Sequence, residues 1–168
     1  GYLALCTQNL PEPTVVPSEH FNTMLWSGNS TDNTSITGVG FTPDWTWIKS
    51  RTTADNHSVY DTARGAQQLL ISNATTQEQA DPSGLKMFDN DGFTLSVAGR
   101  VNVSGRNYVA WNWKANGSGA TNTDGTITST VSANVDAGFS IVSYTGNSTA
   151  GATIGHGLSQ TPDMIIVK

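Results

Sequence analysis

The chain has 168 residues and a formal net charge of -5 at pH 7, and only 12% of its residues are charged. One domain with a buried core is expected at this length. Thr, Ser, Asn and Gly are abundant instead of Lys and Glu, a balance typical of extracellular or virion β-proteins. No Lys or Arg cluster could follow a phosphate backbone, and no apolar run could span a bilayer. We therefore expect neither nucleic-acid binding nor membrane insertion.

Residues 1–20 are predicted to be a linker or the tail of an upstream domain. Pro11, Pro13 and Pro17 fall within a short span, which favours an extended chain. The apolar residues before them resemble the last strand of something upstream. Cys6 is the only cysteine, which excludes an internal disulfide.

Residues 21–115 are predicted to form an antiparallel β-sandwich with minimal helix. Alternating segments such as 21–26, 93–97 and 107–114 are separated by Gly, Asn and Asp turns. In 107–114, we expect Val109, Trp111 and Trp113 to form the apolar face. Only residues 66–72 have a helical composition, and that segment is too short to be stable alone.

Trp45 and Trp47 lie on a segment that is apolar on both faces. Such a run is typical of a central strand that is covered on both sides. We therefore interpret these tryptophans as core residues rather than as a platform for a ligand.

A degraded copy of residues 21–49 closes the chain at 139–168. The two copies align as follows: Phe139 corresponds to Phe21 and Tyr144 to Trp26. Residues 146–149 correspond to 28–31, and residues 161–163 to 42–44. The separation is 139 − 21 = 118 residues, so the repeated unit is a small domain. Residues 116–125 are Gly/Ser/Thr-rich and predict a boundary. Residues 126–168 then either begin a second repeat or supply closing strands of the first domain. We expect the chain to be a piece of a longer tandem protein.

Several stretches resemble a known family: GVGFTPDWTWIKSR, YDTARG, FDNDGFTL, YVAWNWKA and DGTITSTVSANVDAGFSIVSYTG. Similar blocks occur, in this order, in virion structural proteins of tailed phages, especially marine ones. There they form a repeated domain of unassigned function with a SPRY-like or concanavalin-like β-sandwich. The resemblance implies a jelly-roll or concanavalin-like fold and a place on the virion surface, in a tail or fibre protein. It implies no reaction.

Asp89 and Asp91 precede Gly92 in a pattern like the start of a calcium loop. An EF-hand would need Glu at the twelfth position, where this chain has Arg100. We therefore predict a β-turn and no cofactor, with Ca²⁺ on the two carboxylates as the alternative.

Asp61 and Arg64 lie beside Gly65 and are predicted to form a buried, bidentate ion pair, with binding of an anion or a sugar acid as the alternative. No paired carboxylates lie on predicted strands, and no GxSxG motif exists, so we expect no enzyme.

Three functions stay open. The chain could attach a virion to host-surface carbohydrate through loops at one end of the sandwich, with Trp26, Tyr144, Asn29 and Asp32 as ligand-binding residues. It could instead be an architectural spacer or capsid-decoration domain, or a secreted bacterial adhesion or carbohydrate-binding module. For the virion functions, the expected partners are other virion subunits, a host glycan and further copies of the same chain.

Overall fold

The computed structural model describes residues 15–168, and the predictions for residues 1–14 lie outside this range. The protein is an all-β sandwich of antiparallel sheets, as predicted. The only helix among the described residues is a single 3₁₀ turn, η2 (Pro17–Glu19), which leads into the first strand. The described residues include no helix that is long and apolar enough to cross a membrane.

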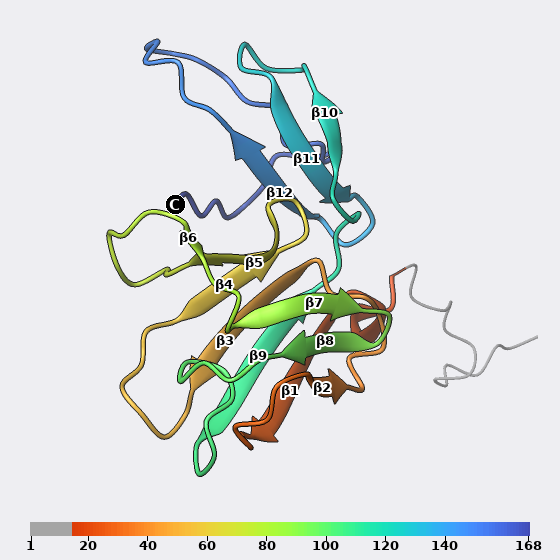
Figure 1. Cartoon of the computed structure of the whole chain (residues 1–168). Coiled ribbons are helices and arrows are strands. Elements are labelled where there is room, and N and C mark those ends of the chain that lie inside the picture. The colour runs from red at the N-terminus through yellow and green to blue at the C-terminus, as the bar shows by residue number, and fades with distance from the viewer. Residues whose placement is uncertain (1–14) are drawn as a thin grey trace, which may run out of the picture.

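The larger sheet has six strands in the order β1-β9-β3-β4-β5-β6 (Figure 1). Strand β9 lies between β1 and β3 and pairs antiparallel with both. The segment with helical composition is strand β5, in which a register shift and the left-handed Gln67 (φ 67°) accommodate an irregular ladder. The strands are β1 (Phe21–Ser27), β3 (Trp45–Ser50), β4 (Ser58–Asp61), β5 (Gly65–Leu70), β6 (Gln79–Ala80) and β9 (Asn107–Trp113).

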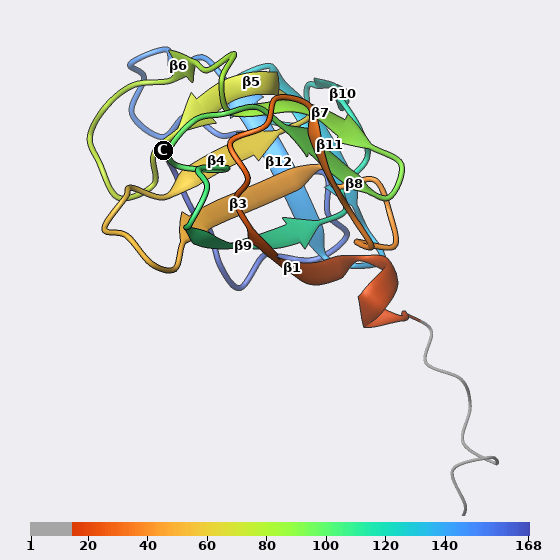
Figure 2. The ribbon, with the colours of Figure 1, turned by 60° about the horizontal axis from the view of Figure 1, so that its bottom comes forward.

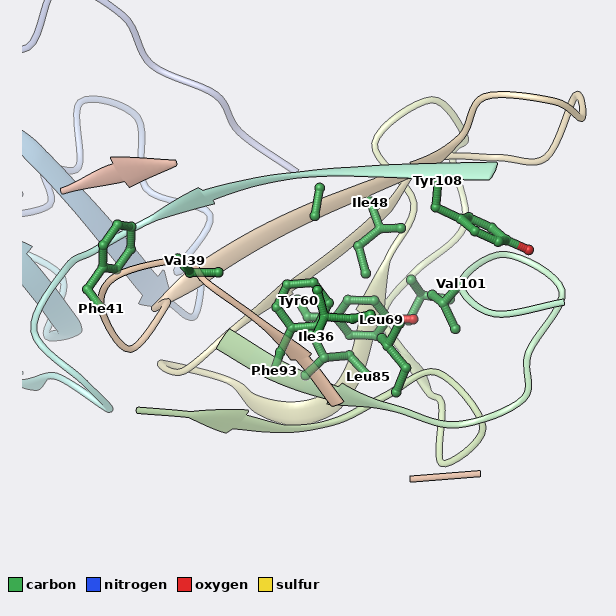
Figure 3. Packing of buried hydrophobic residues seen from close by; sticks show 12 residues of the cluster. Ile36, Val39, Phe41, Ile48, Tyr60, Leu69, Leu85, Phe93, Val101 and Tyr108 are labelled. Carbon is green, nitrogen blue, oxygen red and sulfur yellow. The ribbon is translucent and has the colours of Figure 1, made fainter. Parts of the chain in front are cut away.

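A smaller sheet of β2 (Thr34–Thr37), β8 (Gly92–Leu95) and β7 (Leu85–Asp89) covers one face of the larger sheet. The predicted tight turn joins β7 to β8, since Asp89 pairs with Gly92. Between the two sheets lies a core that includes Tyr60, Phe93 and Tyr108, all fully buried (Figure 3).

The side of β9 that faces the main core carries Tyr108, Ala110 and Asn112, all 0% exposed. It thus includes a polar residue, Asn112. Asn112 is satisfied there, because its Oδ1 accepts from Thr46 Oγ1 at 2.9 Å and its Nδ2 donates to the Asn22 carbonyl at 3.2 Å. The expected apolar face of β9 exists, but it points away from the main core.

Four tryptophans share that outer face of the larger sheet and are half-buried. The prediction that Trp45 and Trp47 belong to the core is therefore only partly right, because the main core lies on the opposite side of β3. A smaller aromatic cluster covers part of the outer face. Phe139 stacks on Trp113 with ring centroids 6.0 Å apart and meets Trp45 edge-on at 6.1 Å.

The chain after β9 forms a third sheet, β10-β11-β12, beyond one end of the sandwich (Figures 1 and 2). Its strands are β10 (Ala120–Asn122), β11 (Ser129–Asn134) and β12 (Phe139–Tyr144). The expected boundary at 116–125 thus contains a strand. These strands pair with one another and add none to the two sheets of the sandwich.

The internal repeat is visible in the backbone. Ser30 and Ser148 both adopt the left-handed conformation, with φ of 57° and 58°. In each copy the preceding Asn accepts a hydrogen bond from the following Thr: Thr31 N to Asn29 Oδ1 at 2.8 Å, and Thr149 N to Asn147 Oδ1 at 3.0 Å. A left-handed serine is uncommon, so its recurrence at the expected position supports a true structural repeat.

Candidate functional site

Trp26 was expected to be an exposed ligand-binding ring, and the structure places it against the core. The indole stacks on Tyr108 with centroids 5.5 Å apart and meets the edge of Phe93 at 5.8 Å. Its Nε1 donates to the Val101 carbonyl at 3.0 Å. Trp26 therefore stabilises the sandwich, and its only hydrogen-bond donor is already in use.

Asn29 is exposed, and its amide pairs with the buried amide of Asn102. Asn102, which is 0% exposed, accepts from Asn29 N at 3.1 Å and donates to Asn29 Oδ1 at 3.0 Å. The same Asn102 amide group donates to the Thr31 carbonyl at 2.9 Å. These bonds join the loop after β1 to the loop before β9, so the Asn29 side chain serves to hold two loops together.

Asp32 is also exposed, in the same loop after β1. Its carboxylate accepts from Lys86 Nζ at 3.0 and 3.1 Å, and Lys86 also donates to Asn33 Oδ1. Hydrogen bonds from Ser96 and then from Lys86 lower the pKa of Asp32. The carboxylate is thus charged at neutral pH and already paired with a cation.

Tyr144, the fourth predicted binding residue, lies in the third sheet and not in the sandwich. Its side chain is 44% exposed at the end of β12. Trp26 and Tyr144 correspond to one another in the repeat, but they belong to different sheets and do not form a common site.

Both carboxylates of the possible calcium site bind protein groups. Asp91 accepts from Gly38 N at 3.0 Å and from Gly40 N at 2.6 Å, and Asp89 accepts from Thr94 Oγ1 at 2.7 Å. Residues 15–168 contain no cluster of three His, Cys, Asp or Glu side chains placed to hold a metal. The two carboxylates act as structural acceptors, in keeping with the predicted β-turn.

The predicted Asp61–Arg64 pair is present, with Asp61 buried and Arg64 partly buried, but it is not bidentate. Arg64 donates from Nε and from its terminal NH₂ to the same oxygen, Asp61 Oδ2, at 2.7 and 2.6 Å. Arg64 also binds Glu78 at 2.8 Å. The pair therefore fixes the β4–β5 turn and the loop before β6.

Sequence reasoning missed a second ion pair, between the buried Asp81 and the partly exposed Arg100. The two side chains form two parallel hydrogen bonds, and Tyr60 Oη donates to Asp81 Oδ2 at 2.5 Å. Burial, and next the charge of Asp81, raise the pKa of Tyr60, while the Asp81 hydrogen bond raises that of Arg100. The partners are 19 positions apart in the sequence, and nothing local indicated that they would meet.

Asp44, in the Thr-Pro-Asp sequence, is a third buried carboxylate with a structural role. It is 5% exposed and accepts from Ala115 N at 2.7 Å, Gly117 N at 3.0 Å and Thr62 Oγ1 at 2.9 Å. It thereby joins the start of β3 to the chain that leaves β9.

The outer tryptophan face carries one histidine. His57 Nδ1 accepts from Trp47 Nε1 at 2.9 Å, and burial followed by the charge of Lys49 lowers the pKa of His57. His57 is therefore neutral at physiological pH, in keeping with its role as a hydrogen-bond acceptor.

The surface hollows of the described residues include two open ones of about 450 and 280 Å³. The larger lies beside Arg64, Glu78 and Lys168, and the smaller beside Phe21, Trp113 and Phe139. Neither brings together a nucleophile, a base and an oxyanion donor in the way that a catalytic site would.

The model of one protein family, described as a domain of unknown function (DUF7483), matches residues 16–168. The match spans the sandwich and the third sheet together. No curated protein and no solved structure matches the chain significantly.

Proposed function

We propose that this chain, which belongs to the DUF7483 family, is a non-enzymatic architectural module on the surface or tail fibre of a virion. The observation that supports this proposal is that the polar groups expected to bind a ligand are engaged within the chain, while large apolar side chains are exposed. At the predicted binding end, Trp26, Asn29 and Asp32 all bind other parts of the same chain. Large apolar side chains are instead exposed at the end of the chain, in residues 164–167.

This distribution differs from that of a glycan site. A sugar site needs an exposed aromatic ring beside free amides or carboxylates, because the ring stacks on the sugar and the polar groups bind its hydroxyls. An architectural module needs rigid loops and apolar surface for its neighbours. The virion setting itself rests on the resemblance of the sequence blocks described above.

Tyr144 favours a second candidate function, attachment to host-surface carbohydrate. It is an exposed aromatic residue, and Asn147 follows it closely on an exposed loop. Tyr144 ends the last strand of the third sheet, and Asn147 lies in the exposed loop that follows it, so an aromatic ring and an amide of the kind a sugar site uses lie close together in sequence.

A binding screen separates the two functions. The purified chain would be tested on a glycan array and on whole bacterial cells, with and without Ca²⁺, and its mass in solution would be measured. We expect no saturable binding from the folded protein under either condition. Saturable binding that Tyr144→Ala abolishes, while the exposed control Met87→Ala leaves it intact, would overturn the architectural proposal in favour of attachment.

A further inference from the structure

The side chain of Asn134 joins the third sheet to the place where the chain enters and leaves the sandwich. Asn134 is the last residue of β11 and lies opposite Phe139 in β12. Its Nδ2 lies 2.8 Å from His20 Nδ1 and donates to the Lys114 carbonyl at 3.1 Å. His20 directly precedes β1, and Lys114 directly follows β9. One amide group therefore bridges the third sheet and the sandwich.

Two hydrogen bonds fix which way round the Asn134 amide lies. Its Oδ1 accepts from Ala137 N at 3.1 Å, while its Nδ2 donates to the Lys114 carbonyl. A rotated amide would place its oxygen against that carbonyl and its NH₂ against the Ala137 N–H, so both bonds would be lost. The second hydrogen of Nδ2 is thus the one that faces His20. His20 Nδ1 must therefore be an unprotonated acceptor.

The backbone holds the His20 ring in this position. His20 N donates to the Pro17 carbonyl at 3.1 Å, and the His20 carbonyl accepts from Lys114 N at 2.9 Å. The residue is half-buried and borders the smaller open hollow, together with Phe21 and Phe139. Water can therefore exchange protons with the ring, while the backbone keeps the ring beside Asn134.

Three charged residues lie on the segments around His20. Glu19 precedes it in η2, Lys114 follows β9, and Asp136 lies in the turn between β11 and β12, whereas β1 begins at an uncharged residue. Both carboxylates are exposed, and within the described chain neither forms an ion pair with His20. A proton on His20 would therefore gain no buried counter-ion in exchange for the hydrogen bond to Asn134.

We propose that the His20–Asn134 hydrogen bond is an acid-sensitive link that holds the third sheet against the sandwich. An ordinary imidazole takes up a proton at about pH 6.5. When Nδ1 carries a proton, two donors face each other and the hydrogen bond is lost. Acid should favour opening, because the open state binds a proton that the closed state excludes. This inference goes beyond the proposed function, because it concerns how the third sheet is held and not what the surface contacts.

The test follows amide hydrogen exchange of the full chain at about pH 7.5 and about pH 5. The reporters are the amides of Asn116, which donates to Ser132 Oγ at 2.8 Å, and of Ala137, which donates to Asn134. Their rates are divided by those of an unstructured peptide at the same pH. We expect their protection to fall about tenfold on acidification. The amides of β8, in the core of the sandwich, should stay equally protected at both pH values.

Replacement of single residues identifies the group that takes up the proton. His20→Asn offers an oxygen acceptor that does not titrate in this range, so the fall in protection should disappear. His57→Asn and His156→Asn change the other two histidines and are the matched controls, which should behave like the wild type. Asn134→Ala removes the other partner of the link and should leave the Asn116 amide weakly protected at both pH values.

The protonation state can also be read directly from the ¹⁵N NMR shifts of the imidazole nitrogens. We expect His20 Nδ1 to carry no proton at about pH 7.5. Four outcomes would overturn the inference: a proton on Nδ1 at that pH, no fall in protection with acid, an equal fall in His20→Asn, or a fall that either control abolishes. None of these results bears on glycan binding, so the proposed function is tested separately.

Discussion

At the scale of single residues, buried carboxylates hold segments of the chain together. Asp81 is 2% exposed and is bound by Arg100 and Tyr60. Gly84 lies against this cluster so closely that a Cβ there would collide with the Asp81 carboxylate and the Tyr60 hydroxyl. A carboxylate with this many charge-assisted and hydroxyl bonds fixes its neighbours more firmly than a hydrophobic contact would.

Replacing Asp81 should destabilise the protein. Asp81→Asn removes a buried charge and leaves Arg100 without its counter-ion, and we expect a loss of about 2 kcal/mol because Arg100 is partly solvated. Urea unfolding measures the change. Asp32→Asn, at an exposed ion pair, is the matched control and should have no measurable effect. Equal losses of stability in Asp81→Asn and Asp32→Asn would show that burial of the Asp81 carboxylate does not strengthen its ion pair.

Tyr60 should make the fold sensitive to alkali. Its pKa is raised in the folded state, so below pH 10 the phenol is protonated in both states and its contribution is complete. Above pH 10 only the unfolded chain ionises readily, so the free energy of unfolding should fall, approaching about 1.4 kcal/mol per pH unit. Urea unfolding between pH 9 and 11 should show a shallower decline for Tyr60→Phe. Parallel declines would contradict this role.

At the scale of the elements, the positions of strands could be predicted from the alternation of apolar and polar residues. Which side of a strand faces the core could not. Alternation located β9 and β12 correctly, because period two depends only on neighbouring residues. The core-facing side of β9 was missed because buried Asn112 looks like a solvent-facing residue until its partners Thr46 and Asn22 are known. Tryptophans on the other side gave the stronger apolar signal.

The candidate site was less predictable than the strands for the same reason. Trp26 and Asn29 have the residue types of a sugar site, and only long-range contacts show that they hold the loops together. The Asp61–Arg64 pair could be predicted because its partners are three residues apart. The Asp81–Arg100 pair could not, since nothing local indicates which arginine a distant aspartate will meet.

Asp44 should control how firmly the third sheet is attached. Asp44→Ala leaves the amides of Ala115 and Gly117 without an acceptor, and we expect a loss of about 2–4 kcal/mol. Amide exchange at residues 115 and 117 should accelerate. Asp163→Ala, the counterpart in the second copy, is exposed and should change neither quantity. A similar loss in both variants would mean that the two copies are equally complete.

At the scale of the whole molecule, the sandwich carries its own core. All members of the main cluster lie between Ile36 and Ala110, and the third sheet contacts the sandwich through residues that include Phe139, Ser132 and Asn134. The sandwich is thus the independent unit, and the third sheet covers one end of its outer face.

Removing the third sheet should leave a folded protein. We expect residues 15–118 to unfold cooperatively, with a loss of about 1–3 kcal/mol from the uncovered Trp45 and Trp113. Thermal and urea unfolding, with tryptophan fluorescence, measure both. Phe139→Ala in the full chain is the control and should reproduce part of the loss. Loss of the cooperative transition in the truncated chain would show that the two parts fold as one.

The path of the backbone also determines how the protein would respond to mechanical load. The chain enters the sandwich at His20 and leaves it at Lys114, and Lys114 N donates to the His20 carbonyl at 2.9 Å. Entry and exit are therefore adjacent, at the same end of the antiparallel pair β1–β9, where Phe21 lies opposite Trp113. A pulling force between these points would peel the two strands apart one hydrogen bond at a time. It would not shear the whole ladder at once. In a tandem array of such units, the force would therefore act on this one strand pair in each sandwich. Each sandwich would unfold and extend at low force.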